Sequence, residues 1–296
     1  MMFLGAAGLP NTRVPTVEIA AGVQMPLLNF GVQKEHGDAI KLGARGLDTA
    51  LVYGDKQQSE VGRAVKASGI AREEFFITTK APCCPGTAFG GHALPISCLF
   101  EKNTTKDVEK DLKLLQVDYV DLLLLHWPCD DMADTIRHYK ALEPFVVSGK
   151  AKALGISNFN ASAIAALMPH VTVKPVINQC GYSIAGHSEA TALWGRDDET
   201  KSACTAHGIT YSAYSPLGGW AKGGTGHVLS DPTVKAVAAA HNRSAAQVAL
   251  KWVVQQGVVA VTSSDKQDHV AGDLAIFDGE FELTSEEMTQ LSKVQR

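Results

Sequence analysis

The stretch VDLLLLHWP, residues 120–128, is the strongest indication of the fold in this sequence. From Val120 to Leu125 every residue except Asp121 is apolar. Apolar runs of this length are typical of strands in a parallel sheet, because helices cover both faces of such a sheet. The run ends abruptly in His126 and Trp127, so a polar ring stands at the end of a strand that is expected to be buried.

Similar runs recur along the chain with helical stretches between them. The predicted strands are 27–32, 46–53, 74–81, 120–127, 151–159, 174–180, 209–217 and 258–264. The predicted helices are 59–69 with Ser59 as N-cap, 107–115, 244–257 with a Ser244–Gln247 capping box, and 284–294 with a Thr284–Glu287 capping box. AGVQMP, residues 21–26, is interpreted as an N-terminal turn that leads into the first strand.

Alternating strands and helices predict an α/β protein with a parallel sheet, either open and doubly wound or closed into a barrel. An open dinucleotide-binding sheet usually carries G-x-G-x-x-G after its first strand, and this sequence has none there. GGWAKGGTG, residues 218–226, has another spacing and follows a late strand. Eight strands therefore favour a single-domain (β/α)8 TIM barrel over residues 17–296, after an N-terminal extension over 1–16.

Composition narrows the function classes. The 296 residues carry a net charge of −4, which gives no basic surface for nucleic acid or for an anionic membrane. No run approaches the roughly 20 apolar residues that span a bilayer, and the N-terminus lacks the basic region of a signal peptide. We therefore expect a cytoplasmic protein that binds neither nucleic acid nor membrane.

The cysteines have irregular spacing. They are Cys83, Cys84, Cys98, Cys129, Cys180 and Cys204. A chain of this size does not need disulfides, so reduced thiols are the expected state. Cys83, Cys84, His92 and Cys98 share one loop, but no pair has C-x-x-C spacing, so no metal site is expected.

Polar residues follow several of the predicted strands. In a (β/α)8 barrel the chemistry lies at the C-terminal ends of the strands, where Asp48, Tyr53, Lys80 and His126 would converge. Each alone has an ordinary structural explanation as a cap, a packed ring or a solvated cation. Together they can act as one site. The tyrosine is the acid, the lysine favours release of the tyrosine proton, the aspartate holds the lysine, and a neutral histidine orients a carbonyl. This set fits carbonyl reduction with hydride from a cofactor.

The sequence resembles the aldo-keto reductases from about residue 17 to its C-terminus. The resemblance is carried by GARGLDTALVY (43–53), ITTKAP (77–82), LLLLHWP (122–128), GKAKALGISNF (149–159), INQ (177–179), YSPLG (214–218) and FDGEFELTSEEM (277–288). It implies a (β/α)8 barrel that reduces aldehydes and ketones with NADPH. It also implies a catalytic tetrad, which falls on the same four residues, with Tyr53 as the proton donor.

The resemblance also implies a set of cofactor-binding residues. Ser157, Asn158 and Gln179 would hold the nicotinamide carboxamide, Tyr214 would stack on the ring, Ser215 and Leu217 would contact pyrophosphate and ribose, and Ser263, Ser264, His269 and Asp273 would lie at the adenosine end. The glycine-rich loop 218–226 either closes over the pyrophosphate or is a plain connection.

The last strand and the segment after it depart from the family pattern. Thr262 stands where the family often has the lysine that binds the 2′-phosphate of NADPH, and His269 falls near the usual arginine. Asp265 and Asp268 add negative charge there, and Asp273 replaces an asparagine near the adenine. NADP(H) remains the expected cofactor, and NAD(H) is the alternative.

Other differences concern the substrate pocket. Gln33 occupies a position where many family members have tryptophan, and Asn29 replaces a common glycine. Trp127 is retained, and Trp220 lies in the glycine-rich loop. These residues and the long 82–103 loop are expected to border the pocket. A long C-terminal tail is absent, which predicts an open pocket that accepts bulky carbonyls.

Two other functions remain open. Some relatives of aldo-keto reductases are nonenzymatic, as channel-associated or lens proteins, so a slow cofactor-sensing subunit is the first alternative. A phosphate-dependent barrel lyase is the second, but it would lack the YSPLG tyrosine. The intact tetrad favours the reductase, acting as a monomer on a small-molecule carbonyl.

Overall fold

A closed barrel forms the centre of the molecule. The computed structural model describes residues 14–32, 37–84, 103–185, 198–218 and 224–294. Eight parallel strands within these ranges close in the order β10-β3-β4-β5-β6-β7-β8-β9. They are β3 (Leu28–Gly31), β4 (Gly46–Asp48), β5 (Phe76–Ala81), β6 (Val120–Leu125), β7 (Ala151–Ser157), β8 (Ile177–Gly181), β9 (Thr210–Tyr214) and β10 (Val259–Thr262). The single-domain (β/α)8 barrel predicted from the strand pattern is confirmed.

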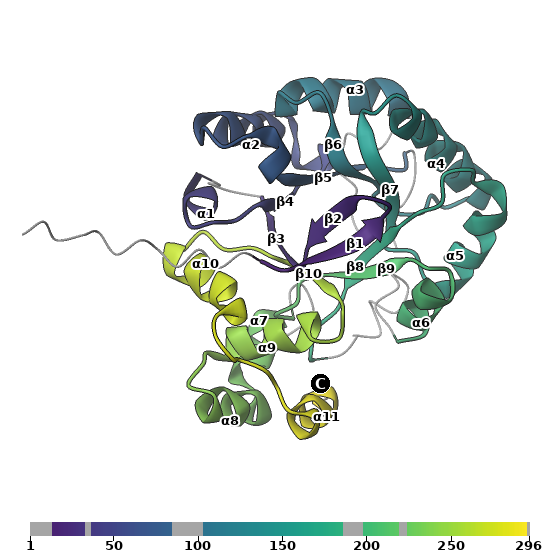
Figure 1. Cartoon of the computed structure of the whole chain (residues 1–296). Helices are drawn as coiled ribbons and strands as arrows, with labels where there is room; N and C mark the ends of the chain where they lie inside the picture. The colour runs from purple at the N-terminus through teal and green to yellow at the C-terminus, as the bar shows by residue number, and fades with distance from the viewer. Residues whose placement is uncertain (1–13, 33–36, 85–102, 186–197, 219–223, 295–296) are drawn as a thin grey trace, which may run out of the picture.

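Helices surround the barrel, which Figure 1 shows nearly end on. They are α1 (Gly37–Lys41), α2 (Asp55–Ala67), α3 (Thr104–Leu115), α4 (Met132–Val147), α5 (Ala161–Leu167), α6 (Asp198–Ala206), α7 (Gly224–Ser230), α8 (Pro232–Ala240), α9 (Ala245–Val254), α10 (Gln267–Leu274) and α11 (Ser285–Ser292). Among the described helices none is long and apolar enough to cross a membrane.

The capping boxes that begin α9 and α11 are present as predicted. The predicted start of α2 is wrong. The helix begins at Asp55, and Gly54 at φ +100° is its N-cap. The Ser59 hydroxyl instead donates back to the Asp55 carbonyl at 2.8 Å, which is the usual bond of a serine inside a helix.

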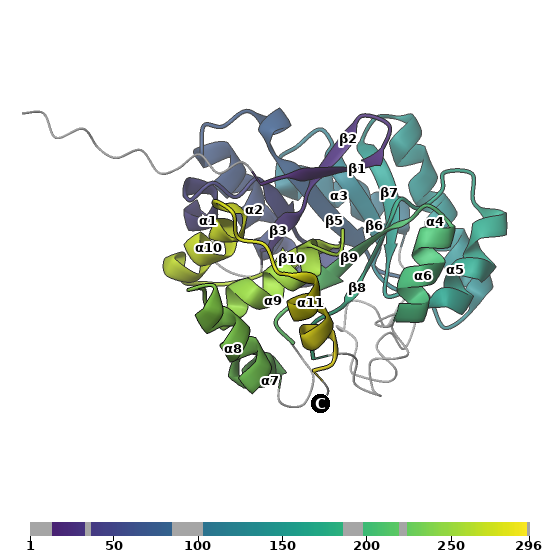
Figure 2. The same ribbon diagram turned by 60° about the horizontal axis from the view of Figure 1, so that its bottom comes forward.

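The N-terminal segment forms a strand pair that the sequence reading missed. β1 (Thr16–Ala20) pairs antiparallel with β2 (Val23–Pro26), so residues 21–26 hold a strand as well as a turn. Met25 is fully buried, and it packs with Ile19 and Val23 against Leu122 and other residues of the barrel strands. Figures 1 and 2 show this hairpin across one end of the barrel. It closes the N-terminal end, which leaves the C-terminal end for the site.

Strand β6 explains why Leu122 to Leu125 are apolar without interruption. Side chains on a strand point alternately to opposite faces. Leu122 and Leu124 pack with the hairpin inside the barrel, whereas Leu123 and Leu125 pack in the larger core with the helices. His126 is the next residue on the face of Leu122 and Leu124, so its side chain is directed to the barrel interior at the C-terminal rim.

Six of the eight predicted strands were too long at their C-terminal ends; the exceptions are 74–81, which ends with β5 at Ala81, and 174–180, which ends one residue before β8. Residues 46–53, for example, form β4 over Gly46–Asp48 and then a 3-10 turn, η1 (Leu51–Tyr53). The chain leaves the barrel after Asp48 because the next helix has to begin on the outside.

Candidate active site

Three strands and one 3-10 turn bring the predicted tetrad together at the C-terminal rim. Asp48 is the last residue of β4, Lys80 is the fifth of the six residues of β5, and His126 directly follows β6. Tyr53 ends η1, which follows β4. The backbone register places Lys80 opposite Leu124 of β6, so the lysine and the histidine occupy adjacent levels of neighbouring strands.

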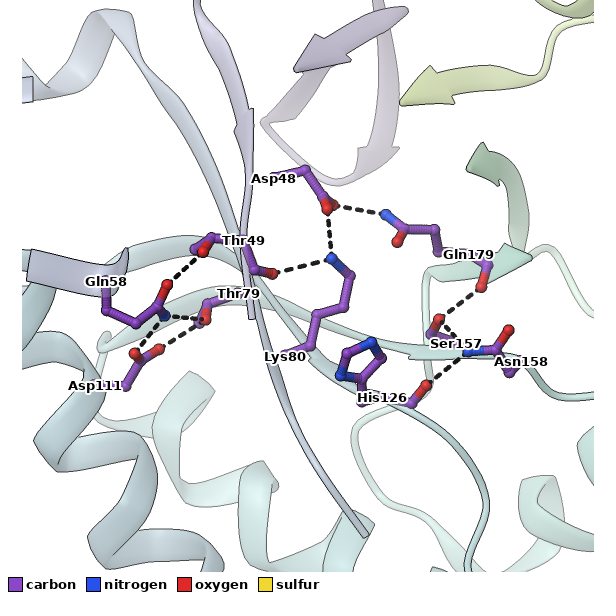
Figure 3. Close-up of polar contacts among 10 residues, drawn as sticks. All are labelled: Asp48, Thr49, Gln58, Thr79, Lys80, Asp111, His126, Ser157, Asn158 and Gln179. Carbon is purple, nitrogen blue, oxygen red and sulfur yellow. Dashed lines mark hydrogen bonds and ion pairs between the residues drawn. The ribbon is translucent and has the colours of Figure 1, made fainter. Parts of the chain in front are cut away.

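Lys80 is fixed by two acceptors in the barrel interior. Its ammonium donates to Asp48 Oδ1 and, at 3.0 Å, to the Thr49 carbonyl (Figure 3). Gln179 Nε2 donates to the other carboxylate oxygen, Asp48 Oδ2, at 2.7 Å. Burial alone would lower the pKa of Lys80, but the Asp48 carboxylate and Tyr53 raise it on balance. The lysine therefore carries a proton at neutral pH although only 1% of it is exposed.

His126 is neutral in this environment. Burial, and then the charge on Lys80, hold the pKa of His126 well below its usual value. Its Nδ1 is buried and has no hydrogen-bond partner among the described residues. A neutral imidazole can donate one hydrogen bond and accept another, so His126 is suited to hold a polar group of a ligand.

Tyr53 completes the group. Its ring centroid lies 6.3 Å from that of His126, nearly perpendicular to it, and 5.8 Å from the Lys80 ammonium nitrogen. Tyr53 is half-buried. The structure thus places a half-buried tyrosine near both a fixed positive charge and a neutral imidazole.

A buried network behind Lys80 was missed in the sequence. The Thr49 hydroxyl donates to Gln58, whose amide donates to Asp111 at 2.5 Å and to Thr79 at 3.3 Å. Thr79 in turn donates to Asp111 at 2.7 Å (Figure 3). The network links helices α2 and α3 to the two residues that neighbour the lysine and its aspartate. A signal was present, because Asp111 lies beside Leu112 on the apolar stripe of α3 and an unpaired carboxylate is not tolerated there.

Asp111→Asn tests whether this carboxylate titrates in the folded protein. Burial raises the pKa of Asp111 from 3.8 to about 6, against the lowering effect of the bonds from Thr79 and Gln58. At pH values between about 4 and 6, Asp111 is therefore protonated in the folded state but ionised in the unfolded state. Wild-type stability from this group therefore rises as pH falls from about 6 to about 4, and the ionised form costs stability above pH 6.

We expect Asp111→Asn to be more stable relative to wild type at pH 8 than at pH 4, with the difference in free energy of unfolding (variant minus wild type) larger by about 3 kcal/mol at pH 8. Urea titrations at both pH values measure this difference. Glu109→Gln, an exposed acid on the same helix, is the control and should show almost none. An equal response of the two variants would show that Asp111 does not titrate near pH 6.

The predicted nicotinamide residues form one hydrogen-bonded group. The Ser157 hydroxyl donates to the Gln179 carbonyl at 2.7 Å, and Asn158 Nδ2 donates to the His126 carbonyl at 3.0 Å. The Tyr214 hydroxyl donates to Asn158 Oδ1 at 2.7 Å. Asn158 also has a left-handed backbone, with φ +63°, as does Ser215 with φ +52°. Such strained conformations at strand ends are common where a backbone receives a ligand. Amide and hydroxyl groups in this arrangement fit a carboxamide, which both donates and accepts.

Two departures from the family pattern pair with each other. The Thr262 hydroxyl donates to Asp273 at 2.9 Å, and both side chains are buried. Burial raises the pKa of Asp273 to about 6, against the effect of that bond. Ser264 contacts His269 Nδ1 at 3.2 Å near the surface, and Ser263 is exposed. The predicted adenosine-end residues therefore lie close together on β10 and α10.

The predicted pocket residues are only partly described. Trp127 is buried, and its ring lies 4.5 Å from that of His126. Leu217 is half-buried after β9. Gln33 and Trp220 lie outside the described residues, as does most of the 82–103 loop. Asn29 is buried at the other end of the barrel and donates to the Pro26 carbonyl at 2.7 Å, so it supports the hairpin and not the pocket.

The expectation of reduced thiols is wrong for Cys83, Cys84 and Cys129, which are all disulfide-bonded. Cys83 and Cys129 form a disulfide, with Cα atoms 5.2 Å apart. Spacing along the chain gave no sign of it, because the two segments meet only when β5 and β6 pair. Cys180 and Cys204 are reduced thiols.

A (β/α)8 barrel with these groups at its C-terminal rim defines an oxidoreductase of the aldo-keto reductase class. The chain belongs to the Aldo/keto reductase family, whose model matches residues 36–296. It is 35% identical to glyoxal reductase of Bacillus subtilis (strain 168), over 97% of this chain and 95% of that protein. It is 34% identical to morphine 6-dehydrogenase of Pseudomonas putida, over 95% and 91%.

A solved structure gives the same result. The aldo/keto reductase from Brucella melitensis superposes with a TM-score of 0.79 at 30% identity, over 95% of this chain and 98% of that one. The family resemblance seen in the sequence is therefore confirmed. Aldo-keto reductases use nicotinamide cofactors, which agrees with the Asn158–Tyr214 group.

Proposed function

We propose that this protein reduces aldehydes and ketones to alcohols, with Tyr53 as the general acid. The observation that carries the proposal is the charged Lys80, which Asp48 and the Thr49 carbonyl hold beside Tyr53 and a neutral His126. A fixed cation favours the phenolate that proton donation leaves behind. The site presents an acid and a neutral orienting group, as carbonyl reduction requires.

Each residue has one part in the reaction. His126 donates a hydrogen bond that orients the substrate carbonyl oxygen toward Tyr53. As negative charge develops on that oxygen, the Tyr53 hydroxyl transfers its proton to it. Lys80 stabilises the phenolate, and Asp48 with Gln179 keeps the lysine in place. Trp127 covers the site and excludes water from it.

The cofactor-binding residues support a reduced nicotinamide as the second reactant. Ser157, Asn158 and Gln179 would hold its carboxamide, and Tyr214 would stack on its ring. Ser215 and Leu217 would bind the pyrophosphate and ribose. When bound, the cofactor supplies a hydride to the carbonyl carbon.

We propose NADPH as the working cofactor, with NADH as the alternative. Ser263, Ser264 and His269 would bind the 2′-phosphate. Thr262 would not, because its hydroxyl already donates to Asp273. The exposed Asp265 and Asp268 weaken binding of a dianion.

The double variant Asp265→Asn/Asp268→Asn is expected to raise kcat/KM for NADPH about fivefold, because each exposed charge contributes about 0.5 kcal/mol. The NADH value should not change. Steady-state assays with both cofactors at low and high salt measure this, and the gain should shrink with salt. Asp134→Asn, an exposed acid on α4, is the control. An equal gain with NADH would place the 2′-phosphate elsewhere.

The proposed function is tested directly by loss of reduced-nicotinamide absorbance with an activated aromatic aldehyde, in parallel with NADPH and NADH. Turnover with either supports the reductase, and the ratio gives the cofactor preference. Cofactor binding measured by fluorescence quenching without turnover of several aldehydes and ketones would contradict it. That result would favour the cofactor-sensing relative.

A further inference from the structure

The Cys83–Cys129 disulfide joins the two segments that leave the barrel directly after two tetrad residues. Cys83 is three residues after Lys80, and Cys129 is three residues after His126. The bond therefore cross-links the rim at β5 and β6, between residues 46 positions apart. Nothing in the proposed reaction uses these sulfurs.

Trp127 connects the cross-link to the site. Its indole Nε1 donates to the Cys83 carbonyl at 3.0 Å, and its ring packs on His126 at 4.5 Å between centroids. Only Pro128 separates Trp127 from Cys129. The tryptophan is therefore held at both sides by the two cysteine segments. Reduction of the disulfide would therefore loosen Trp127, which packs against His126.

The two cysteines differ in exposure. Cys83 is fully buried, whereas Cys129 is partly exposed. We therefore expect an external thiol to attack at Cys129 and not at Cys83. His138 lies within 4.8 Å of both sulfurs through a ring nitrogen, and the Thr104 hydroxyl contacts its Nδ1 at 2.7 Å. A histidine ring nitrogen near the buried sulfur can donate a hydrogen bond to the thiolate that leaves, and the proton comes from solvent or the reductant.

We propose that Cys83–Cys129 is a redox modification site, reduced by a dithiol, that controls the carbonyl pocket through Trp127. A thiolate of the dithiol attacks Cys129 Sγ, which forms a mixed disulfide and releases Cys83 as a thiolate that takes up a proton. The second thiol of the reductant then attacks its own mixed disulfide and releases Cys129. Two electrons and two protons pass to the protein, and the dithiol leaves as its disulfide.

The consequence for catalysis rests on the proposed function. In the reduced protein the Trp127 segment loses its covalent tie, so the pocket over His126 is less well fixed. We expect KM for the aldehyde to rise and kcat/KM to fall by about tenfold, because small displacements at a reacting site cost rate. Cofactor affinity should not change, since the proposed cofactor-binding residues lie on or directly after β7 to β10 and on α10, and not on the two cysteine segments.

The experiment uses the whole protein without substitutions first. It is equilibrated in glutathione buffers of increasing oxidised fraction, the thiols are alkylated, and the peptides that carry Cys83 and Cys129 are quantified by mass spectrometry. Aldehyde reduction and NADPH binding are measured on the same samples. We expect the two peptides to change together and reversibly, and kcat/KM to follow them. The peptide measurement does not depend on activity. If the protein were inactive, the proposed function would be contradicted, but reduction of the disulfide could still be measured.

Two variants separate the cross-link from general redox effects. Cys129→Ser, at the partly exposed position, should behave as the reduced protein in every buffer. Cys204→Ala, at a buried reduced thiol of α6, should respond as wild type.

Several results would overturn the proposal. Full alkylation of both cysteines in the most oxidising buffer would show that no bond forms. A bond that a strong dithiol cannot reduce in the folded protein would be structural only. Equal kcat/KM for aldehyde in both states would remove the link to the pocket. The purified protein could also contain one equivalent of zinc that protects both cysteines from alkylation until a chelator removes it. That result would show that these residues and His138 are metal ligands instead.

Discussion

Tyr53→Phe is expected to lose about 10²- to 10⁴-fold in kcat for aldehyde reduction, which is the usual contribution of a general acid. The substitution removes one oxygen and keeps the ring that packs 6.3 Å from His126. The loss should fall on kcat and kcat/KM together, because proton transfer to the carbonyl oxygen occurs in the transition state and not in substrate binding. NADPH affinity should stay within about twofold of wild type, since Tyr53 is not among the residues proposed to hold the cofactor.

Tyr139→Phe is the matched control, because it removes the same oxygen elsewhere. The Tyr139 hydroxyl is buried in α4 and donates to the Val173 carbonyl at 3.0 Å. Its loss should lower the free energy of unfolding by about 1 kcal/mol and leave kcat unchanged. Tyr53→Phe should show the opposite pattern. Equal kcat in Tyr53→Phe and wild type would remove this tyrosine from the role of acid.

Three of the tetrad residues could be placed from the sequence by one rule, and the fourth, Tyr53, lies on the turn directly after the strand of Asp48. Parallel strands place their C-terminal ends at one rim, so polar residues after separate apolar runs have to meet there. The side-chain alternation of β6 then directs His126 inward, at the level above Leu124. Both steps follow from strand order and side-chain alternation alone, without knowledge of how closely distant segments approach each other.

The supporting contacts could not be predicted in the same way. The bonds from Gln58 and Thr79 to Asp111 depend on how closely α2 and α3 approach β5, which strand order does not determine. The Cys83–Cys129 bond likewise depends on the paths of two segments after their strands. The sequence offered only a polar residue on an apolar stripe and an irregular set of cysteines.

Lys80→Met is the second variant with a large expected effect, and it should reduce both activity and stability. Activity should fall by about 10²- to 10⁴-fold, because the phenolate of Tyr53 loses its stabilising cation. Stability should fall by about 3–5 kcal/mol, since breaking a buried ion pair leaves the Asp48 carboxylate without its partner charge. Urea unfolding and steady-state kinetics measure the two losses.

Lys251→Met is the control for removal of a buried lysine. Lys251 donates to Glu282 at 2.6 Å, but the Glu282 side chain is 65% exposed and solvent compensates its charge. The loss of stability should therefore be clearly smaller than in Lys80→Met, and activity should be retained. Because the pKa of Lys80 is raised, its contribution to stability is complete below the ordinary lysine pKa and is lost only as pH rises through the higher folded value. The part of the stability difference that comes from titration of Lys80 should thus be constant from about pH 6 to 9.

The double variant Asp48→Asn/Lys80→Met separates the two roles of the pair. It removes both charges, and the side-chain amide oxygen introduced at position 48 can still accept the bond from Gln179 Nε2 that Asp48 accepts at 2.7 Å. Much of the stability lost in Lys80→Met should return, because the buried charge without a partner was its cause. Activity should remain as low as in the single variant, since a neutral pair supplies no cation to Tyr53. Recovery of activity along with stability would mean that Lys80 acts only on the fold and that proton donation by Tyr53 does not need its charge.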